Sequence, residues 1–518
     1  MLFNSYVFIF AFLPVTLAGF FLLGRFQPKL AAAWLTAASL FFYGWWNPLY
    51  VWLLAVSIVF NYACGVAITR AVARGDQGMR KRMLAFAVTV NLGVLAYYKY
   101  ANFFLASINH FSGAALSFGE IVLPLGISFF TFTQIAFLAD AYFGKAREYN
   151  FVHYGLFVTY FPHLIAGPVL HHAEMMPQFG LPATYRFSFE NTAVGITIFV
   201  IGLFKKVMVA DEVGAYAKPV FDAAAAGAEL TLIEAWCGAL AYTFQLYFDF
   251  SGYSDMAIGL SRLFGVVLPL NFHSPYQAVN IIEFWRRWHM TLSRFLRDYL
   301  YFPLGGNRRG AARRYVNMMI TMALGGLWHG AGWTFVAWGA LHGGYLVINH
   351  GWRALRARLG HDLRRSTWWG RACACLLTFT AVVIGWVLFR AADFTAAVAM
   401  LKAMAGMNGL VLPDFWLPKW GAAGQWLAAH GVRFGDTRDL VGGGVVNWIW
   451  ILLAVVWFAP NTQQLLAAYR PALALLAGQT HARFTWRPTP FYALLTAALA
   501  LIAIFNLHKQ SEFLYFQF

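Results

Sequence analysis

Charged residues are scarce in this chain of 518 residues. Asp, Glu, Lys and Arg make up 11% of the sequence, whereas hydrophobic residues make up 60%. An ordinary soluble domain has roughly 25% charged residues. With so few charges, a soluble fold would leave a large apolar surface in contact with water. The composition therefore excludes a soluble globular protein and predicts one that lies in a lipid bilayer.

The alternation of apolar and polar residues that a membrane β-barrel needs is also missing. Instead, uncharged apolar runs recur along the whole chain. Only helices or closed barrels satisfy the backbone in lipid, so the sequence predicts an all-α polytopic membrane protein. At about 20 residues per crossing, we expect a bundle of roughly ten to twelve transmembrane or re-entrant helices. The main runs are 30–42, 51–69, 121–139, 193–204, 336–348, 376–389, 445–458 and 492–505.

We expect a single membrane domain over residues 1–518. Residues 404–441 are rich in glycine, proline and tryptophan and carry scattered charges, which predicts an extramembrane or interfacial excursion. The first apolar run, 6–23, has no basic segment before it and no small-residue cleavage pattern after it. This run is therefore predicted to be a retained transmembrane helix rather than a signal peptide.

Cysteine is rare, and convincing sets of metal ligands are missing. The four cysteines, at positions 64, 237, 373 and 375, all lie in apolar runs. They fit neither a disulfide framework nor a zinc site. His163, His171 and His172 lie close together in sequence, but no suitable group of cysteines or carboxylates surrounds them. We therefore expect no disulfide and no metal site.

Acidic residues are far outnumbered by basic ones, 21 against 38, and the net charge is +17. In a soluble protein this excess would suggest a nucleic-acid partner, which we do not expect here. The basic residues lie in short loops between apolar runs, as the positive-inside rule describes. Placing these loops in the cytoplasm puts the N-terminus and the turn at 45–48 on the outer side. The basic clusters lie within 25–29, 70–82, 308–314 and 353–371.

Two histidines stand out against this apolar background, His289 in the segment 284–290 and His329 in the segment 325–333. An imidazole takes and returns a proton near neutrality, because its unperturbed pKa is about 6.5. An ionisable residue inside a membrane is by default a candidate functional group. For both histidines a purely structural role, with the ring packed and hydrogen-bonded between helices, is the competing interpretation.

The segment 282–300 is predicted to be one amphipathic helix that lies at an interface or dips into the bundle from the cytoplasmic side. In such a helix Trp285, His289, Leu292 and Leu296 share one face. The charges on this segment are too many for it to span lipid alone. The ion pairs expected at helical spacing join Glu283 to Arg286 or Arg287, and Arg294 to Asp298.

His329 is predicted to lie within the thickness of the membrane. Between the basic residues Arg314 and Arg353 the chain must cross outward and return, which would need about 40 residues plus a turn. The interval is shorter than that. The glycines at 325–326 and 330–332 predict a turn that stops below the outer surface.

Asp249 and Asp255 lie inside an apolar stretch, where a carboxylate is costly unless it is paired. They could orient a histidine, bind an arginine, conduct ions or belong to a structural network, and the sequence leaves these roles open. Proline and glycine also interrupt the apolar runs at Pro124, Gly126 and 162–168. Such breaks indicate interior segments that can form a site.

Together these segments resemble the membrane-bound O-acyltransferase family, in particular its bacterial polysaccharide O-acetyltransferase branch, to which proteins of alginate and cellulose acetylation belong. The resemblance spans nearly the entire chain and is poorest at about 406–442 and around 70–82. Its motifs are specific in combination. They are 98–103, 123–129, 161–168, 202–207, 245–259, 283–293, 296–300, 304–308, 325–333 and 513–518.

The resemblance implies that His329 is catalytic and that His289 is a second active-site residue. It also implies a bundle around a central pore in the bacterial inner membrane, entered by the acyl donor from the cytoplasm and by the acceptor from the periplasm. We expect His329 to act as general base on an acceptor hydroxyl that attacks a thioester. Acetyl-CoA is the expected donor, and no permanently bound cofactor is expected.

The resemblance leaves the acceptor open. An exopolysaccharide, alginate or cellulose, is favoured, acetylated directly or through a periplasmic partner protein, with a polysaccharide synthase complex as a further partner. D-alanyl transfer and peptidoglycan acetylation are the alternatives within the family, and a transporter or channel is the alternative from another class. The donor-binding residues are open too. Lys205, Lys206, Arg286 and Arg287 either attract the phosphates of the donor or are ordinary positive-inside charges.

Overall fold

The computed structural model describes every residue except 364, 436, 438–440, 474–484, 510–513 and 515–518. The first helices are η1 (Phe8–Phe12), α1 (Leu13–Phe26), α2 (Pro28–Gly44), α3 (Leu49–Ala73), α4 (Gln77–Leu95), η2 (Ala96–Tyr100), α5 (Ala101–Ser112), α6 (Ile127–Tyr142) and α7 (Phe151–Thr159). The middle helices are α8 (Phe161–Leu164), α9 (His172–Phe179), α10 (Phe189–Phe204), η4 (Lys205–Ala210), α11 (Asp211–Ala225) and α12 (Leu232–Leu263).

The second half continues the helical pattern. It contains α13 (Ile281–Arg287), α14 (Met290–Leu296), η6 (Arg297–Tyr301), α15 (Gly310–His329), α16 (Trp333–Arg358), α17 (Trp368–Arg390) and α18 (Phe394–Met404). After these come β1 (Val411–Pro413), α19 (Trp416–Ala429), β2 (Arg433–Gly435), α20 (Gly443–Phe458), α21 (Thr462–Leu465) and α22 (Pro490–Phe505). Short 3-10 turns are η3 (Pro182–Tyr185), η5 (Pro275–Gln277), η7 (Ala467–Tyr469) and η8 (Leu507–Lys509).

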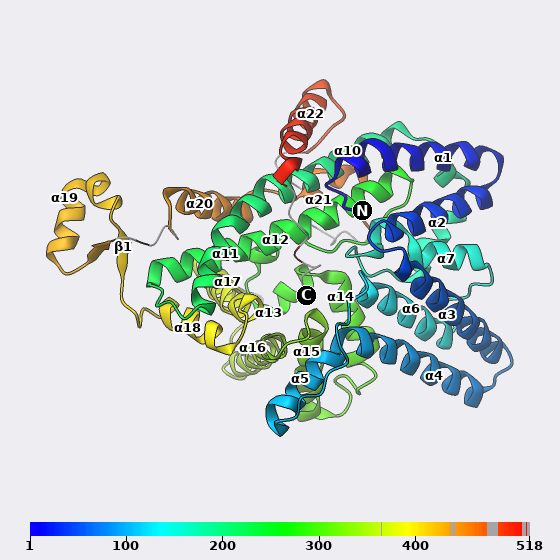
Figure 1. Ribbon diagram of the computed structural model, residues 1–518, viewed down its shortest axis with the longest axis horizontal. Helices are drawn as coiled ribbons and strands as arrows, with labels where there is room; N and C mark the ends of the chain where they lie inside the picture. Colours follow the sequence, from blue (N-terminus) through cyan, green and yellow to red (C-terminus); the bar gives the residue numbers. More distant parts are fainter. Residues whose placement is uncertain (364, 436, 438–440, 474–484, 510–513, 515–518) are drawn as a thin grey trace.

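In Figure 1 the blue and cyan helices α1–α4, α6 and α7 lie on one side, α10–α12 run through the middle, and α17 and α18 lie on the other side. Helix α5 lies apart from the other early helices, in the lower middle of the view. The long helix α12 packs against both α10 and α11, and α15 packs against α16 as a hairpin. Helix α12 has 32 residues and is buried over most of its length, so it forms the central axis of the bundle.

Five helical segments are long and apolar enough to cross a membrane by length and composition. They are Phe8–Phe26, Leu49–Ala73, Gln77–Ser112, Phe189–Ala225 and Trp368–Arg390. Three shorter apolar helices, Phe394–Met404, Gly444–Phe458 and Pro490–Phe505, accompany them. The prediction of an all-α, multi-pass membrane protein is confirmed, whereas the number of ten to twelve crossings stays a prediction.

Seven of the eight main apolar runs lie inside single helices, and the run 121–139 does not. Helix α6 begins only at Ile127, because Pro124 and Gly126 form a turn before it. Gly126 has a φ of 71°, and a Cβ there would stand 3.0 Å from Leu164 O. This position therefore requires glycine on both conformational and steric grounds. Within the segment 123–126, Pro124 is buried and the other three residues are half-buried, and all four line a cavity, as expected for a segment that can form a site.

Within the predicted excursion 404–441, β1, α19 and β2 form a small unit over residues 411–435. β1 and β2 pair in parallel, and α19 between them is kinked at Gly421. In Figure 1 the yellow β1 and α19 project away from the bundle. The position of this unit relative to the membrane stays a prediction, and residues 436 and 438–440 lie outside the described part.

The contact between α10 and α12 depends on small residues. A Cβ at Gly202 would stand 2.5 Å from Gly252 O, and a Cβ at Gly195 would stand 2.8 Å from Gly259 O. These two glycine pairs lie two turns apart on each helix. Glycine at such positions lets two backbones approach closely, as in membrane helix pairs.

We expect Gly202→Ala to destabilise the protein by roughly 1–3 kcal/mol, because the added methyl overlaps a backbone carbonyl that cannot move aside. Gly93→Ala is the matched control. A Cβ at Gly93, inside α4, meets nothing within 4 Å, so this variant should gain roughly 0.5–1 kcal/mol. Thermal unfolding of both variants in detergent tests the prediction. Equal unfolding temperatures for Gly202→Ala and the wild type would contradict the close contact.

Candidate active site

His329 is the last residue of α15, where this helix turns into α16. The hairpin is held closed at Gly326 and Gly339. A Cβ at Gly326 would overlap Phe335 O, and a Cβ at Gly339 would overlap Met322 O. The two backbones are therefore in direct contact one turn below His329. This contact fixes the height and the direction of the helix end that carries the imidazole.

The predicted glycine-rich turn included Gly325 and Gly326, and the observed turn is shorter. Residues Gly325 and Gly326 are helical, and only Gly330, Ala331 and Gly332 form the connection. The first two glycines serve helix packing rather than chain reversal. At 1.5 Å per residue, His329 lies about 22 Å along α15 from Arg314, less than a hydrocarbon core of about 30 Å. This length supports the prediction that His329 lies below the outer surface.

The prediction of one continuous helix over 282–300 is wrong. The chain forms α13, a break at residues 288–289, α14 and the π-helical turn η6. His289 occupies the break with a φ of 42°, which a residue other than glycine rarely adopts. Its side chain therefore does not continue the predicted stripe but turns into the interior, where it is fully buried.

The predicted ion pairs of this segment are only partly correct. Arg287 pairs with Glu283 at 2.6 Å, as expected. Arg294 instead forms a bidentate pair with Glu174 on α9, and Asp298 pairs with Arg297. The break at 288–289 precedes both Arg294 and Asp298, and the irregularity between these two residues is the π-helical turn η6, which begins at Arg297. The pair with Glu174 ties α14 to α9 across the molecule.

Asn271 holds His289 in place. The Asn271 side-chain oxygen lies 3.0 Å from His289 Nδ1 and accepts a hydrogen bond of 3.0 Å from the Thr291 hydroxyl. Its amide nitrogen donates to Ser254 Oγ on α12. The backbone N–H of Thr291 also points at the oxygen, and an N–H can only donate. The atom facing His289 is therefore an acceptor, so in the neutral ring Nδ1 carries the proton and Nε2 carries the lone pair.

The structure brings the two predicted histidines together. Their ring centroids are 6.4 Å apart, although the residues are 40 positions apart in sequence. His289 is fully buried and His329 is 5% exposed. Each ring is surrounded by aromatic side chains, His289 by Phe250 and His329 by Trp328 and Trp338. Two imidazoles at this separation can contact one reacting group from two sides.

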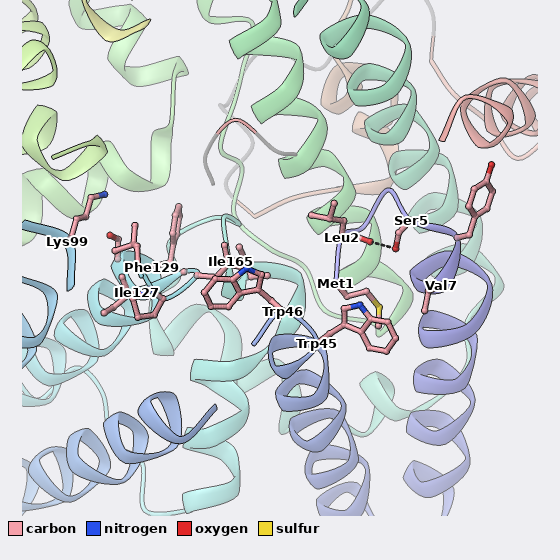
Figure 2. Close-up of a pocket in the computed structure, with 16 residues that line it drawn as sticks. Met1, Leu2, Ser5, Val7, Trp45, Trp46, Lys99, Ile127, Phe129 and Ile165 are labelled. Atoms are coloured by element: carbon pink, nitrogen blue, oxygen red, sulfur yellow. Dashed lines mark hydrogen bonds between the residues drawn. The ribbon is translucent and has the colours of Figure 1, made fainter. Parts of the chain in front are cut away.

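A first cavity, of about 620 Å³, approaches His329 from the side of the turn 45–48. Figure 2 shows Lys99 at one end of the row of lining residues, with Trp46 next to Ile165 in the middle and Trp45 next to Met1 towards the other end. Lys99 Nζ donates to Trp328 O at 2.6 Å and to His329 O at 3.3 Å. The first cavity therefore ends at the backbone of His329.

A second cavity, of about 420 Å³, lies among α13, α14, η6, α15 and α16. Its basic lining residues are Arg286, Arg297, Arg314 and His350, and its inner wall includes Trp285 and Met322. Arg314 belongs to the basic cluster 308–314, which the positive-inside rule predicts to be cytoplasmic, and Arg286 and Arg297 belong to the neighbouring segment 282–300. The two cavities are therefore lined by different parts of the chain. The lining of the second cavity is basic, whereas the lining of the first cavity includes Trp45 and Trp46.

The imidazoles of His289 and His329 line neither of these two cavities. An aromatic layer of Trp285, Trp338 and His342 separates the second cavity from His329. The Trp285 ring is 5.9 Å from that of Trp338, which is 5.1 Å from that of His329. Within the described residues, neither ring nitrogen of His342 and neither indole N–H of the two tryptophans has a hydrogen-bond partner. The layer thus offers buried polar groups to any ligand that reaches it.

Asp249 and Asp255 form ion pairs with lysines. Lys206 lies 2.7 Å from both Asp249 and Asp211, and Lys205 lies 2.6 Å from Asp255. Helix α12 continues through both carboxylates without a break. Of the four cations considered for the donor, Lys205, Lys206 and Arg287 are thus held in ion pairs, and Arg286 lines the second cavity.

The three histidines that were considered as metal ligands, at positions 163, 171 and 172, contact separate partners. His163 contacts Phe157 O, His171 contacts Asp140 and Tyr299, and His172 contacts Glu148. Among the residues that the structure describes, no group of three or more His, Cys, Asp or Glu is arranged to hold a metal. Histidine 171 and Tyr299 instead line a third cavity of about 810 Å³.

Several site residues were not identified from the sequence. Lys99 is the only Lys, Arg, Asp or Glu between Arg82 and Glu120, and this isolation was a signal that an interior partner exists. His342 lies inside an apolar run in the same way. Asn271 carried no such signal, because its role depends on a loop that folds back against His289.

Known proteins match this chain over most of its length. The model of the membrane-bound O-acyltransferase family matches residues 40–386. The peptidoglycan O-acetyltransferase of Helicobacter pylori is 43% identical over 439 residues, which cover 80% of this chain and 81% of its own. A probable alginate O-acetylase of Azotobacter vinelandii is 43% identical over 423 residues, 80% of either chain. The teichoic acid D-alanyltransferase of Streptococcus thermophilus is 26% identical over 284 residues, 51% of this chain and 68% of its own.

We expect Asn271→Leu to lower the rate of acyl transfer about tenfold or more, because His289 loses the acceptor that fixes its tautomer and orientation. Ser254→Ala is the matched control, since it removes only the partner of the Asn271 amide nitrogen. Rates are measured on purified protein of verified monodispersity. A wild-type rate for Asn271→Leu would show that the hydrogen bond does not position His289.

Proposed function

The chain belongs to the membrane-bound O-acyltransferase family, and on this premise we propose that it transfers acetyl groups from cytoplasmic acetyl-CoA across the bacterial inner membrane for O-acetylation of an exopolysaccharide. It is a multi-pass O-acyltransferase of the branch to which its bacterial polysaccharide O-acetyltransferase relatives belong. The observation that carries the proposal is the placement of His289 and His329, 6.4 Å apart, between two cavities.

The linings of the two cavities differ in charge, and this difference suits a phosphate-bearing acyl donor in the second cavity and an acceptor in the first. The lining of the second cavity includes Arg286 and Arg314, on the side that we assign to the cytoplasm, where a donor with phosphate groups is available. The first cavity has no Asp or Glu in its lining and begins at Trp45 and Trp46, which are 54% and 40% exposed. Tryptophan is favoured at the membrane interface. This arrangement supports a periplasmic first cavity that receives the acceptor, with the N-terminus on the same side.

In the proposed reaction, proton transfer and acyl transfer take place beside the imidazole rings of His289 and His329. His329 takes the proton of an acceptor hydroxyl as its oxygen attacks the thioester carbonyl carbon. The C–O bond forms, the carbonyl becomes an oxyanion, and its collapse breaks the C–S bond. The thiolate of the donor receives the proton that His329 accepted. General base catalysis of this kind contributes about 10²- to 10⁴-fold.

The role of His289 depends on its tautomer. Because Nδ1 donates to Asn271, Nε2 of the neutral ring is an acceptor that can orient the hydroxyl of the acceptor. His289 can donate to the oxyanion only after it has taken up a proton. In this scheme His329 is the base and His289 is the orienting group.

The donor must pass the aromatic layer. Trp285 and Trp338 stand between the second cavity and His329, so transfer requires a movement of these rings. The indole N–H groups and the nitrogens of His342 are suited to the amide and thioester oxygens of the donor arm. A closed layer also keeps the two compartments separate, which favours an enzyme over an open channel.

The acceptor that we propose is an exopolysaccharide of the alginate or cellulose type, acetylated directly or through a periplasmic partner protein, with a synthase complex as a further partner. The identities with the peptidoglycan and alginate relatives are equal at 43%, so peptidoglycan is the alternative acceptor. The lower identity of 26% with a D-alanyltransferase disfavours a D-alanyl group.

We expect His329→Ala to abolish acyl transfer, with at least a 10²-fold loss of rate, because no other base stands at this position. His289→Ala should also lose most of the activity. The control is His430→Ala, an exposed histidine beyond the end of α19. Incorporation of radiolabelled acetyl from acetyl-CoA is measured in membranes with equal protein content. Unchanged transfer by His329→Ala would contradict the proposed function.

We expect Arg286→Gln to raise KM for acetyl-CoA about threefold with little change in kcat, because one exposed charge contributes up to about 1 kcal/mol. The double variant with Arg314→Gln should show a larger increase. Lys218→Gln, an exposed residue paired with Asp222 on α11, is the control. Initial rates at varied donor concentration provide the test, and a double variant with the wild-type KM would exclude the second cavity as the donor entrance.

A further inference from the structure

The last carbonyls of α15 are capped by two side chains from another helix. Lys99 Nζ donates to Trp328 O and His329 O, and the Tyr100 hydroxyl donates to Leu327 O at 3.0 Å. The three carbonyls are consecutive and end at His329. Both donors come from η2, the π-helical turn between α4 and α5.

A buried helix end needs such partners. The last four carbonyls of a helix have no intrahelical donor, and they form the negative end of its dipole. A lysine ammonium is suited to this position because it is a cation with three donors. The Lys99 ammonium also lies 5.8 Å from the centre of the Trp328 ring. Lys99 thus contacts both the backbone and the side chain of the residue that precedes His329.

The π-helical turn makes this contact possible. A π turn inserts an extra residue into a helix and changes the direction of the side chains that follow, and such turns are frequent at functional sites. In the α4–α5 segment it falls at Ala96–Tyr100, so that Lys99 and Tyr100 both face α15. Since α4 and α5 otherwise have few buried residues, this contact is their main link to the site.

Lys99 also lines the first cavity, together with Pro124, Gly126 and Ser128. It is the one charged side chain in that lining. The same ammonium therefore touches the space that we assign to the acceptor and the backbone that carries His329. Any group that binds in the cavity next to Lys99 acts on the end of α15.

We propose that Lys99 and Tyr100 are positioning residues that hold the His329 imidazole in its reactive place and couple it to the first cavity. This inference rests on the proposed function, because it assigns a role in the same transfer. The cap restrains the end of α15, and the end of α15 sets the direction of the imidazole. Loss of the cap should therefore impair the chemical step while leaving donor binding, which takes place in the second cavity, unchanged.

The test compares Lys99→Met, Lys99→Arg and Tyr100→Phe in full-length purified protein with radiolabelled acetyl-CoA as the probe. Lys99→Met keeps the length of the side chain and removes its donors, and Lys99→Arg restores donors and charge. Tyr62→Phe is the matched control, because the Tyr62 hydroxyl likewise donates to a carbonyl, that of Tyr149, at 2.6 Å. Thermal unfolding and size-exclusion profiles are recorded for every variant.

We expect Lys99→Met to lower kcat about 10²-fold without a change in the KM for acetyl-CoA, since a misplacement of about 1 Å has an effect of this size. Lys99→Arg should recover most of the rate, and Tyr100→Phe should lose less than Lys99→Met. A wild-type kcat for folded Lys99→Met, or an equal loss in Tyr62→Phe and Tyr100→Phe, would overturn the proposal.

If Lys99→Met does not fold, the pair Tyr100→Phe and Lys99→Arg decides. A kcat of Tyr100→Phe equal to that of Tyr62→Phe overturns the positioning role, and a selective loss of kcat in Tyr100→Phe supports it. His329→Ala is measured in parallel. Activity that persists in His329→Ala refutes the proposed function itself, whereas activity lost in His329→Ala but retained in the Lys99 and Tyr100 variants refutes only this inference.

Discussion

The structure depends on one constraint, that polar side chains buried in a membrane bundle must be held by specific partners. His289 is held by Asn271, the carbonyls that end at His329 are held by Lys99 and Tyr100, and the carboxylates of α12 are held by Lys205 and Lys206. An unpaired polar group in such surroundings costs several kcal/mol. The partners come from other segments of the chain, Asn271 from a loop and the lysines and Tyr100 from the turns η2 and η4, and these polar contacts hold the segments around the two imidazoles together.

Irregular helix geometry allows these contacts to form. Three π-helical turns carry the residues concerned: η2 contains Lys99 and Tyr100, η4 contains Lys205 and Lys206, and η6 contains Tyr299. The left-handed backbone of His289 serves the same end. Strained or irregular backbone of this kind persists where surrounding contacts determine it, and it is frequent at functional sites. The glycine contacts at Gly326 and Gly339 then fix the α15–α16 hairpin rigidly enough for a defined position of His329.

Much of the fold was predictable because apolar runs in a membrane have one solution, the helix. Seven of the eight main runs became helices, and the two histidines of the site were identified by their apolar surroundings. The break in the segment 282–300 was not predictable, because it depends on a tertiary contact with Asn271, and periodicity carries no information about tertiary contacts. For the same reason the pairing of Arg294 with Glu174 and the cap by Lys99 were missed. A single sequence shows that Lys99 and Asp249 need partners, but it does not show which ones.

The central claim is that a thioester on the cytoplasmic side and a hydroxyl on the periplasmic side react at one buried pair of histidines. The most direct measurement supplies radiolabelled acetyl-CoA only to the cytoplasmic face of sealed inverted membrane vesicles and follows the side on which labelled product accumulates. The account predicts acetylated product inside the vesicles, the former periplasmic side, and none with His329→Ala. Labelled product found only on the outer face of these vesicles, with the donor, would contradict it.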